Sequence, residues 1–350
     1  MTEHTVREES LRAFVEEVFT RQGVPEADAA ISADVLISAD LRGISSHGVA
    51  RLPYYSGRMR EGKINPRPRM ELTSFSPATA LLDAGNGLGM VAGVRAMEEC
   101  IRKAEGLGVG FVAVKNSCHF GIAGYYSMMA LAHDMVGIAL SNASPRVVPL
   151  WGREGMLGTN PFSIAIPSGR EPPFVLDMAT SAVSSGKIEE ALRQGKPIPE
   201  GWVYDTGEKI ELDERGMIPM SVLHLPLGWT KELGGHKGYG LALMVDLLSG
   251  PLSGANFGRK LSSAFDPEAP GAGVGHFFGA LRVDGFRPVE EFKDAVDEAA
   301  KAPGRERVYV AGEPEAEAEA LARKEGIKLK APVVEKLQEV AESIGLEFKL

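Results

Sequence analysis

The chain has 350 residues, 44% hydrophobic and 24% charged, which is enough apolar material for a large core. Its formal net charge of −9 comes without any basic run, so nucleic acid is not an expected partner. Two cysteines without metal-ligand spacing, no apolar signal segment and no run of about 18 apolar residues predict a reduced, cytoplasmic protein with neither a metal nor a membrane span.

The order of hydrophobic patterns predicts the elements. Helical spacing over residues 6–41 predicts two amphipathic helices with a break at 23–25. A loop follows at 44–48, and the next helix should begin near Arg51 because Pro53 fits only a first turn. From about 78 to 178, β-type runs alternate with helical stretches, which predicts an α/β core.

The same patterns suggest a division of the chain. We expect an N-terminal helical segment at 1–75 that packs with a C-terminal helical segment at 288–350. Residues 76–287 should form an α/β domain with a helical insertion at about 184–254, where strand signals are few.

A glycine-rich segment at 87–93 follows a predicted strand and opens a predicted helix, which is where a dinucleotide-binding fingerprint belongs. Its spacing is GxGxxxG, one residue too long, and the next strand ends at Lys115-Asn116 without the acid that would bind a ribose. We therefore expect no Rossmann fold, and interpret the glycines as a turn where helix and strand pack closely.

Ser46 and His47 lie on a glycine-flanked loop, followed by Arg51. A histidine held beside hydroxyls suits a general acid or base near neutral pH, and a guanidinium matches a carboxylate. A surface or capping histidine is a second interpretation. A serine hydrolase using Ser46 and His47 is a third, although adjacent side chains rarely point at each other and no oxyanion loop accompanies them.

Polar groups at other strand ends form further candidates. His119 precedes a helix start at 120–124, where backbone N–H groups can bind a phosphate or a carboxylate. On its own, that histidine is better explained as a buried, hydrogen-bonded residue. Thr159 and the segment 177–181 are found as often in turns and caps as in sites. The segment 234–240 lacks the GxxxxGK[ST] order of a nucleotide triphosphatase, but its glycines still allow a phosphate contact.

Seven segments in order resemble the type 2 malate/L-lactate dehydrogenase family, which includes malate, L-sulfolactate and ureidoglycolate dehydrogenases. They are SSHGVAR, DAGNGLGMVAG, KNSCHFGIAGYYSMMA, LGTNPFSIAIP, LDMATSAVSSGKI, GGHKGYGLALMVDLLSG and AGEPE. The segments cover most of the chain from about Asp40 to Glu315. No single motif is decisive, but the ordered set is highly specific.

The resemblance implies hydride transfer between NAD or NADP and a small 2-oxo or 2-hydroxy acid. It also implies a mostly antiparallel sheet unlike the Rossmann fold, and a homodimer with sites near the subunit interface. The family's proton donor falls on His47 with Ser46 as its hydrogen-bonding neighbour, an acid/base of some members falls on His119, and substrate contacts fall on Arg51 and Thr159. The expected cofactor contacts are Phe120, Gly121, Ile122, Ala123, Gly124, Asp177, Met178, Ala179, His236, Lys237, Gly312 and Glu313.

Three positions depart from the family pattern. Lys187, a further candidate catalytic position, falls where one branch places an aspartate of its proton relay, which argues against that branch's imine-reductase mechanism. Ala311 replaces a usual proline, and a usual double glycine after Trp151 is reduced to Gly152. An inactive cofactor-binding relative is another interpretation, against which the candidate histidines and arginine argue. The sequence leaves the acid, and the choice between NAD and NADP, open.

Overall fold

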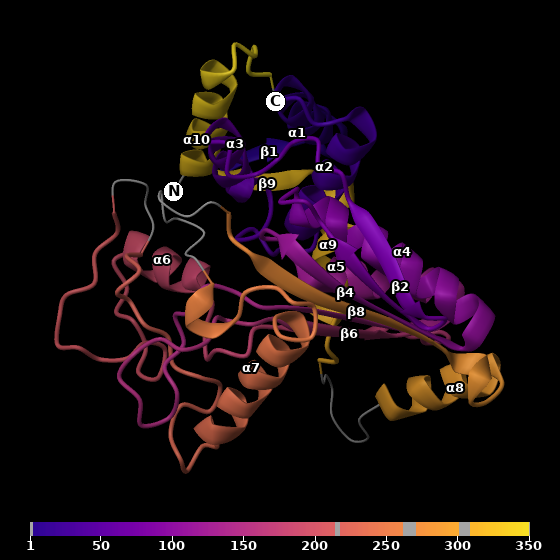
Figure 1. Ribbon diagram of the computed structural model, residues 1–350. Coiled ribbons are helices and arrows are strands. Elements are labelled where there is room, and N and C mark those ends of the chain that lie inside the picture. The colour runs from indigo at the N-terminus through magenta and orange to yellow at the C-terminus, as the bar shows by residue number, and fades with distance from the viewer. Residues whose placement is uncertain (1–2, 214–217, 262–270, 301–308, 350) are drawn as a thin grey trace.

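A computed structural model describes residues 3–213, 218–261, 271–300 and 309–349. Figure 1 shows helices from both chain ends gathered at one side, a long sheet through the middle, and a loop-rich region around α6 and α7. In the described residues, one sheet has the strand order β2-β3-β4-β8-β5-β6-β7. Its strands are β2 (Glu71–Ser76), β3 (Thr79–Asp83), β4 (Val109–Ser117), β5 (Met135–Ser141), β6 (Phe162–Ile166), β7 (Phe174–Met178) and β8 (Val274–Arg282).

The pairing of this sheet confirms the prediction of a mostly antiparallel α/β fold. The β3–β4 pair is parallel, and every other neighbouring pair is antiparallel. The strand β8 joins the two halves of the sheet, although it comes more than a hundred residues after β5 in the chain. Such a long-range insertion is invisible to local hydrophobic patterns.

Helices cover both faces of the sheet. The helix α4 (Gly89–Leu107) packs on β4 and β8, and α5 (Ala123–Met129) packs on β5 and β6. The helix α7 (Gly235–Ser249) lies against the opposite face, since a Cβ at Gly275 would lie 1.9 Å from the carbonyl oxygen of Ser249. The next residue, His276, points the other way and stacks on Phe120, as neighbours in a strand must.

The glycine segment at 87–93 serves close packing, as interpreted from the sequence. A Cβ at Gly89 would lie 2.2 Å from the carbonyl oxygen of Cys118 and 2.6 Å from that of His119. A Cβ at Gly93 would lie 2.5 Å from the ring of Tyr126. The start of α4 therefore lies directly on the backbone that presents His119.

The two ends of the chain meet in a small ribbon and a helical cluster. The strand β1 (Glu3–Val6) pairs with β9 (Ile327–Lys330), and α10 (Ala331–Ser343) packs on α3 (Leu52–Arg60). The helix α1 (Glu8–Arg21) packs on α2 (Glu26–Leu41), and α2 also contacts α9 (Glu313–Glu325). Because α2 has neighbours on several sides, it is buried along most of its length. The prediction that this helix is amphipathic is therefore wrong.

The remaining helices lie away from this cluster. The helix α8 (Val289–Ala300) lies at the far end of the sheet in Figure 1, where the carboxylate of Asp297 accepts the N–H groups of Gly169 and Arg170. The helix α6 (Ser185–Arg193) stands in the loop-rich region. None of the described helices is long and apolar enough to cross a membrane.

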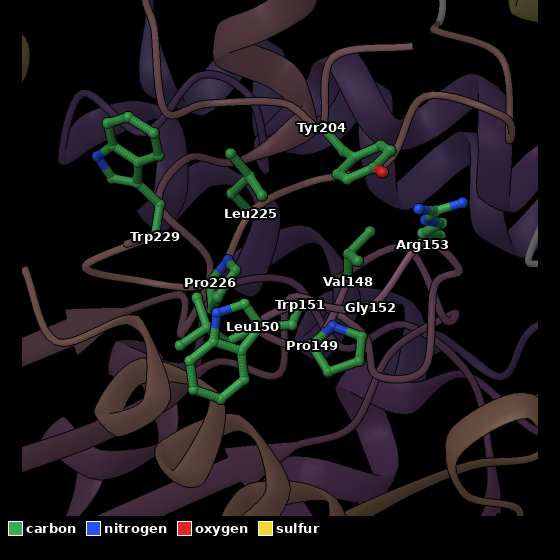
Figure 2. A pocket seen from close by; sticks show the side chains of 10 residues that line it. All are labelled: Val148, Pro149, Leu150, Trp151, Gly152, Arg153, Tyr204, Leu225, Pro226 and Trp229. Atoms are coloured by element: carbon green, nitrogen blue, oxygen red, sulfur yellow. The ribbon is translucent and has the colours of Figure 1, made fainter. Parts of the chain in front are cut away.

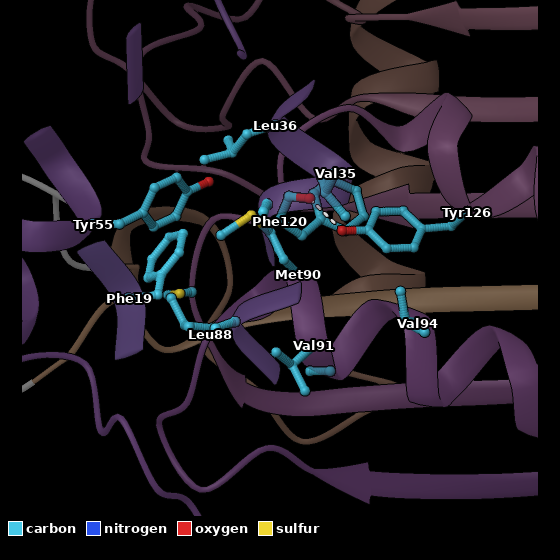
Figure 3. Packing of buried hydrophobic residues seen from close by; sticks show 14 of the residues in the cluster. Phe19, Val35, Leu36, Tyr55, Leu88, Met90, Val91, Val94, Phe120 and Tyr126 are labelled. Atoms are coloured by element: carbon cyan, nitrogen blue, oxygen red, sulfur yellow. Dashed lines mark hydrogen bonds between the residues drawn. The ribbon is translucent and has the colours of Figure 1, made fainter. Parts of the chain in front are cut away.

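The main core joins the N-terminal helices to the sheet. Figure 3 shows Phe19, Leu36 and Tyr55 from the helical cluster packed toward Met90 of α4 and Phe120. All of these side chains are at most 2% exposed, and burial of each stabilises the fold by roughly 1.5–3 kcal/mol. The same packing therefore places the loop after α2 beside the end of β4.

Candidate active site

The loop that carries Ser46 and His47 is held in place by the side chain of Asp40. The backbone N–H of Val49 donates to Oδ2 of Asp40 at 2.7 Å, and a Cβ at Gly48 would lie 2.1 Å from Oδ1 of the same carboxyl group. Any larger residue at position 48 would displace the Asp40 carboxyl group, which gives the glycine of the SSHG sequence a steric reason. Burial raises the pKa of Asp40 to about 7, against the lowering effect of the Val49 hydrogen bond.

The raised pKa of Asp40 predicts how stability depends on pH. Between about pH 4 and 7 the folded chain keeps a proton on this carboxyl that the unfolded chain releases, so wild-type stability should fall as pH rises. The variant Asp40→Asn keeps an acceptor for Val49 and should lack this fall, which is on the order of a few kcal/mol. Urea unfolding of both proteins across this range measures the difference, and parallel pH profiles would contradict it.

His47 and His119 come from segments far apart in the chain and meet in one site. Their rings stack with centroids 5.5 Å apart and planes at 25°. The Ser46 hydroxyl lies 2.9 Å from Nδ1 of His47, so these two side chains do meet, although adjacent side chains rarely point at each other. Burial, and then the positive charge of Arg51, lowers the pKa of His47 to about 3. The ring is therefore neutral at pH 7.

His119 is held in one tautomer. The N–H of Gly121 donates to its Nδ1 at 3.3 Å, and the Tyr55 hydroxyl lies 2.6 Å from the same atom. An N–H group can only donate, so Nδ1 is an acceptor and the ring proton belongs on Nε2. Burial lowers the pKa of His119 well below its ordinary value, with further lowering by His47 and Arg51. Tyr55, which the sequence analysis missed, is fully buried.

Besides burial, the positive charge of Arg51 lowers the pKa of both histidines, and Arg51 has no acidic partner among the described residues. Its Nε donates to the Ser46 carbonyl at 2.7 Å, and no salt bridge involves it in the described chain. A Cβ at Gly186 would lie 2.8 Å from Cβ of Ser46 and 3.9 Å from Nη2 of Arg51, so the start of α6 covers the loop. Lys187, the next residue on α6, is exposed. Its catalytic role stays a prediction.

His224, also missed, ties α6 to the loop after β5. Its Nδ1 lies 3.2 Å from the carbonyl oxygen of Val183 and its Nε2 lies 3.1 Å from the Ser185 hydroxyl. Its own carbonyl accepts the N–H of Val148 at 3.0 Å. Burial lowers the pKa of this histidine to about 4, so at neutral pH it is a fixed, uncharged connector.

The expected cofactor segment at 120–124 is mostly buried. Phe120, Ile122 and Ala123 are inside the protein, and the Phe120 ring stacks on His276 with centroids 4.6 Å apart. The N–H of Gly124 donates to Oδ2 of Asp177 at 2.7 Å, which joins this segment to β7. Burial raises the pKa of Asp177 to about 6, partly offset by this hydrogen bond. The side chains of Phe120, Ile122 and Ala123 are therefore covered by the protein itself.

Thr159 and the end of β7 meet the start of α7. The Thr159 carbonyl accepts the N–H and the hydroxyl of Thr180 at 2.9 and 3.1 Å, and the Thr180 carbonyl accepts the N–H of Leu227 at 3.0 Å. Leu227 packs under α7, whose first turn exposes His236 and Lys237. Met178 and Ala179 are half-buried beside this junction.

Gly312 and Glu313 lie at the start of α9, beside β7. The carbonyl oxygen of Ala311 accepts the N–H of Val175 at 2.9 Å, and Gly312 has a φ of +98° that suits glycine. A Glu313 carboxylate oxygen accepts the N–H of Val310 at 2.9 Å. The structure therefore places the start of α9 beside β7, the strand that ends with Asp177 and Met178.

A cavity of about 270 Å³ with aromatic walls lies next to the junction of β7 and α7, where Leu225 and Pro226 line it. Figure 2 shows flat side chains around it, with Tyr204 and Trp229 on one side and Trp151 near Pro149 on the other. None of its lining residues was predicted as a site residue. Two of them, Trp151 and Gly152, were named in the sequence analysis, but only as the place where the family's double glycine is reduced. The lining is Val148, Pro149, Leu150, Trp151, Gly152, Arg153, Tyr204, Leu225, Pro226 and Trp229.

The family model described as malate/L-lactate dehydrogenase matches residues 6–338. The chain belongs to this family. It is 42% identical to a malate dehydrogenase of Pyrococcus horikoshii over 98% of this chain and 96% of that one. It is 40% identical to an L-sulfolactate dehydrogenase of Methanocaldococcus jannaschii over 98% of both chains.

A solved malate dehydrogenase of Entamoeba histolytica superposes on the whole chain with a TM-score of 0.91 and 34% identity, covering 100% of both chains. Family membership confirms the resemblance read from the seven motifs, and with it the prediction of a dehydrogenase that acts on CH–OH groups of hydroxy acids. The family assignment therefore argues against the interpretation of Ser46 and His47 as a serine hydrolase pair.

Proposed function

We propose that the protein interconverts a small 2-oxo acid and its 2-hydroxy acid with NAD or NADP, at a site formed by His47, His119 and Arg51. One observation supports this most directly. Two neutral, stacked histidines stand beside a guanidinium that has no salt bridge in the described chain. A 2-oxo acid brings the complementary groups, namely a carboxylate and a carbonyl oxygen that gains negative charge on reduction.

In this proposal each side chain has a separate role. Arg51 binds the carboxylate through its planar guanidinium. His119 donates its Nε2 hydrogen to the substrate oxygen and stays neutral, because Nδ1 is occupied by Gly121 and Tyr55. His47 exchanges the proton, with Ser46 as the partner of its Nδ1. The structure thus favours His47 over His119 as the acid/base.

The lowered pKa of His47 fits both directions of the reaction. As a neutral base it can take the hydroxyl proton of a 2-hydroxy acid. For reduction it must first be protonated, which Arg51 opposes in the free protein. A bound carboxylate would offset the charge of Arg51 and raise the pKa of His47.

A nicotinamide cofactor supplies the hydride when bound. The residues present fit such a group. Trp151, Tyr204 and Trp229 offer flat faces for a planar ring. The start of α7 offers a helix N-terminus with the exposed side chains of His236 and Lys237 for a phosphate. We favour α7 over the segment 120–124 for the phosphate, because the carboxylate of Asp177 already holds the N–H of Gly124.

We further propose that the protein is a homodimer that uses the exposed face of α7. After its first turn this helix is apolar on all sides apart from the buried Asp246: Ala242 and Val245 are buried against the sheet, whereas Leu243, Met244 and Leu247 remain 38–50% exposed. A helix that is apolar all round needs cover on every face. A second copy is the occupant that the family resemblance implies.

A charged substitution tests this interface. The double variant Leu243→Glu, Leu247→Glu is expected to shift the mass from dimer to monomer, since burying two carboxylates in an apolar interface is costly. Light scattering after size-exclusion chromatography measures the mass. The matched control is Leu321→Glu on α9, which is also 50% exposed and should leave the dimer intact. A monomeric wild type, or an unshifted double variant, would contradict the interface.

An absorbance assay tests the proposed reaction. Oxidation of NADH or NADPH is followed at 340 nm with a panel of small 2-oxo acids, and the reverse reaction with the matching 2-hydroxy acids. We expect turnover with at least one acid and one cofactor. Cofactor binding without turnover of any acid would favour a relative that has lost activity.

A further inference from the structure

Arg146 is a buried cation with poor partners. It lies on the loop after β5 and is only 7% exposed. Its Nη2 and Nε lie 2.6 and 3.1 Å from the sulfur of Met220, and its Nη1 lies 3.4 Å from the carbonyl oxygen of Pro219. A thioether and one long carbonyl contact are weak acceptors for a guanidinium with five N–H donors.

No carboxylate forms a salt bridge with Arg146 in the part of the chain that the structure describes. Buried charges in proteins are normally paired, because a lone one loses its hydration without compensation. Burial lowers the pKa of Arg146, and the more distant charges of Glu189 and Asp213 offset this only in part. Burial of this guanidinium therefore carries a desolvation cost, which an acidic ligand would offset by pairing with the charge.

Arg146 lies close to the proposed substrate site. Its carbonyl oxygen accepts the N–H of His224 at 2.7 Å, and the His224 ring contacts Ser185 at the start of α6. The next residue of α6, Gly186, packs on Ser46 and Arg51. Besides burial, the positive charge of Arg51 contributes to the lowering of the pKa of Arg146.

We propose that Arg146 is a specificity-determining residue that binds a second acidic group at the far end of the substrate. The inference rests on the proposed function, and it names the substrate class as 2-oxo acids with a carboxylate or a sulfonate beyond the oxo group. Arg51 binds the carboxylate next to the oxo carbon, and Arg146 binds the second anion. Such a ligand neutralises two neighbouring cations, whereas a mono-acid leaves Arg146 buried and unpaired.

Matched substrate pairs test this role. Oxaloacetate and 2-oxobutyrate have four carbons and differ in the second carboxylate, and sulfopyruvate and pyruvate differ in a sulfonate. We expect the wild type to prefer the diacid of at least one pair. In Arg146→Met, kcat/KM for that diacid should fall by roughly 10- to 100-fold, the loss expected for a charge-assisted hydrogen-bonding partner. The mono-acid should change less than about threefold, so that the preference collapses.

Two further variants separate a substrate contact from a structural role. Arg146→Lys keeps the charge but not the fork, and should keep part of the preference. Arg102→Met removes an arginine whose side chain is 66% exposed on α4, and should change nothing. Equal losses for diacid and mono-acid in Arg146→Met, or a wild type that prefers mono-acids, would overturn the proposal. If Arg146→Met does not fold, an unchanged preference in Arg146→Lys overturns it. A wild type inactive on all four acids would instead count against the proposed reaction.

Discussion

Replacing His47 with alanine is expected to lower kcat by at least about a hundredfold, while the Kd for the cofactor stays near that of the wild type. The loss is the one typical of a missing general acid/base. Its structural basis is the stacked pair of His47 and His119, of which only His47 is free to change its protonation. Steady-state kinetics and cofactor titration of the same preparation measure both quantities.

His119→Asn is the matched comparison. An asparagine keeps an N–H donor at this position but cannot take up a proton, so a hydrogen-bonding role should tolerate it better than an acid/base role. We expect a smaller loss of kcat than in His47→Ala and an unchanged pH profile. Near wild-type turnover in His47→Ala, together with a large loss in His119→Asn, would move the proton-transfer role to His119.

Arg51→Lys is expected to raise KM for the oxo acid by roughly tenfold or more, with a smaller change in kcat. A bidentate contact with a carboxylate does not survive replacement by a point charge, and a hydrogen bond to a charged group contributes roughly 1.5–3 kcal/mol. The variant also gives up the donor to the Ser46 carbonyl. Initial rates at varied acid and saturating cofactor measure the change.

The control for Arg51→Lys is the KM of the same variant for the cofactor, which should stay near the wild-type value because Arg51 does not line the aromatic cavity. An unchanged KM for the acid would show that Arg51 is not the carboxylate anchor. Arg146 would then be the first cation to test in its place.

Much of the fold could be predicted because its signals are local. The helix breaks near Gly23 and Gly43, the alternating runs of β4 and β5, and the apolar helix after residue 234 are each visible within a short window. The strands β1, β2 and β9 were not predicted. β2 is exposed along its whole length, so it has no alternation of burial, and β1 and β9 are short and pair across the entire chain.

The candidate site was predictable only in part, because some of its residues lie in local motifs and others are defined by long-range packing. His47, Arg51 and His119 stand in motifs whose residue types already suggest chemistry. Asp40 hydrogen-bonds to the backbone of Val49, and Tyr55 hydrogen-bonds to the ring of His119. Both contacts depend on how the helices pack. A buried aspartate inside a helix and a tyrosine after a proline are ordinary in sequence, and their roles come from position alone.

The central claim is that this chain transfers a hydride between a nicotinamide and carbon 2 of the acid, with His47 handling the proton. The most direct test uses NADH or NADPH dideuterated at C4 of the nicotinamide, with mass spectrometry of the hydroxy acid formed. We predict that the wild type places one deuterium on carbon 2 in every product molecule, and that His47→Ala does so at least about a hundredfold more slowly. A hydroxy acid without deuterium, or equal rates in the two proteins, would contradict the account.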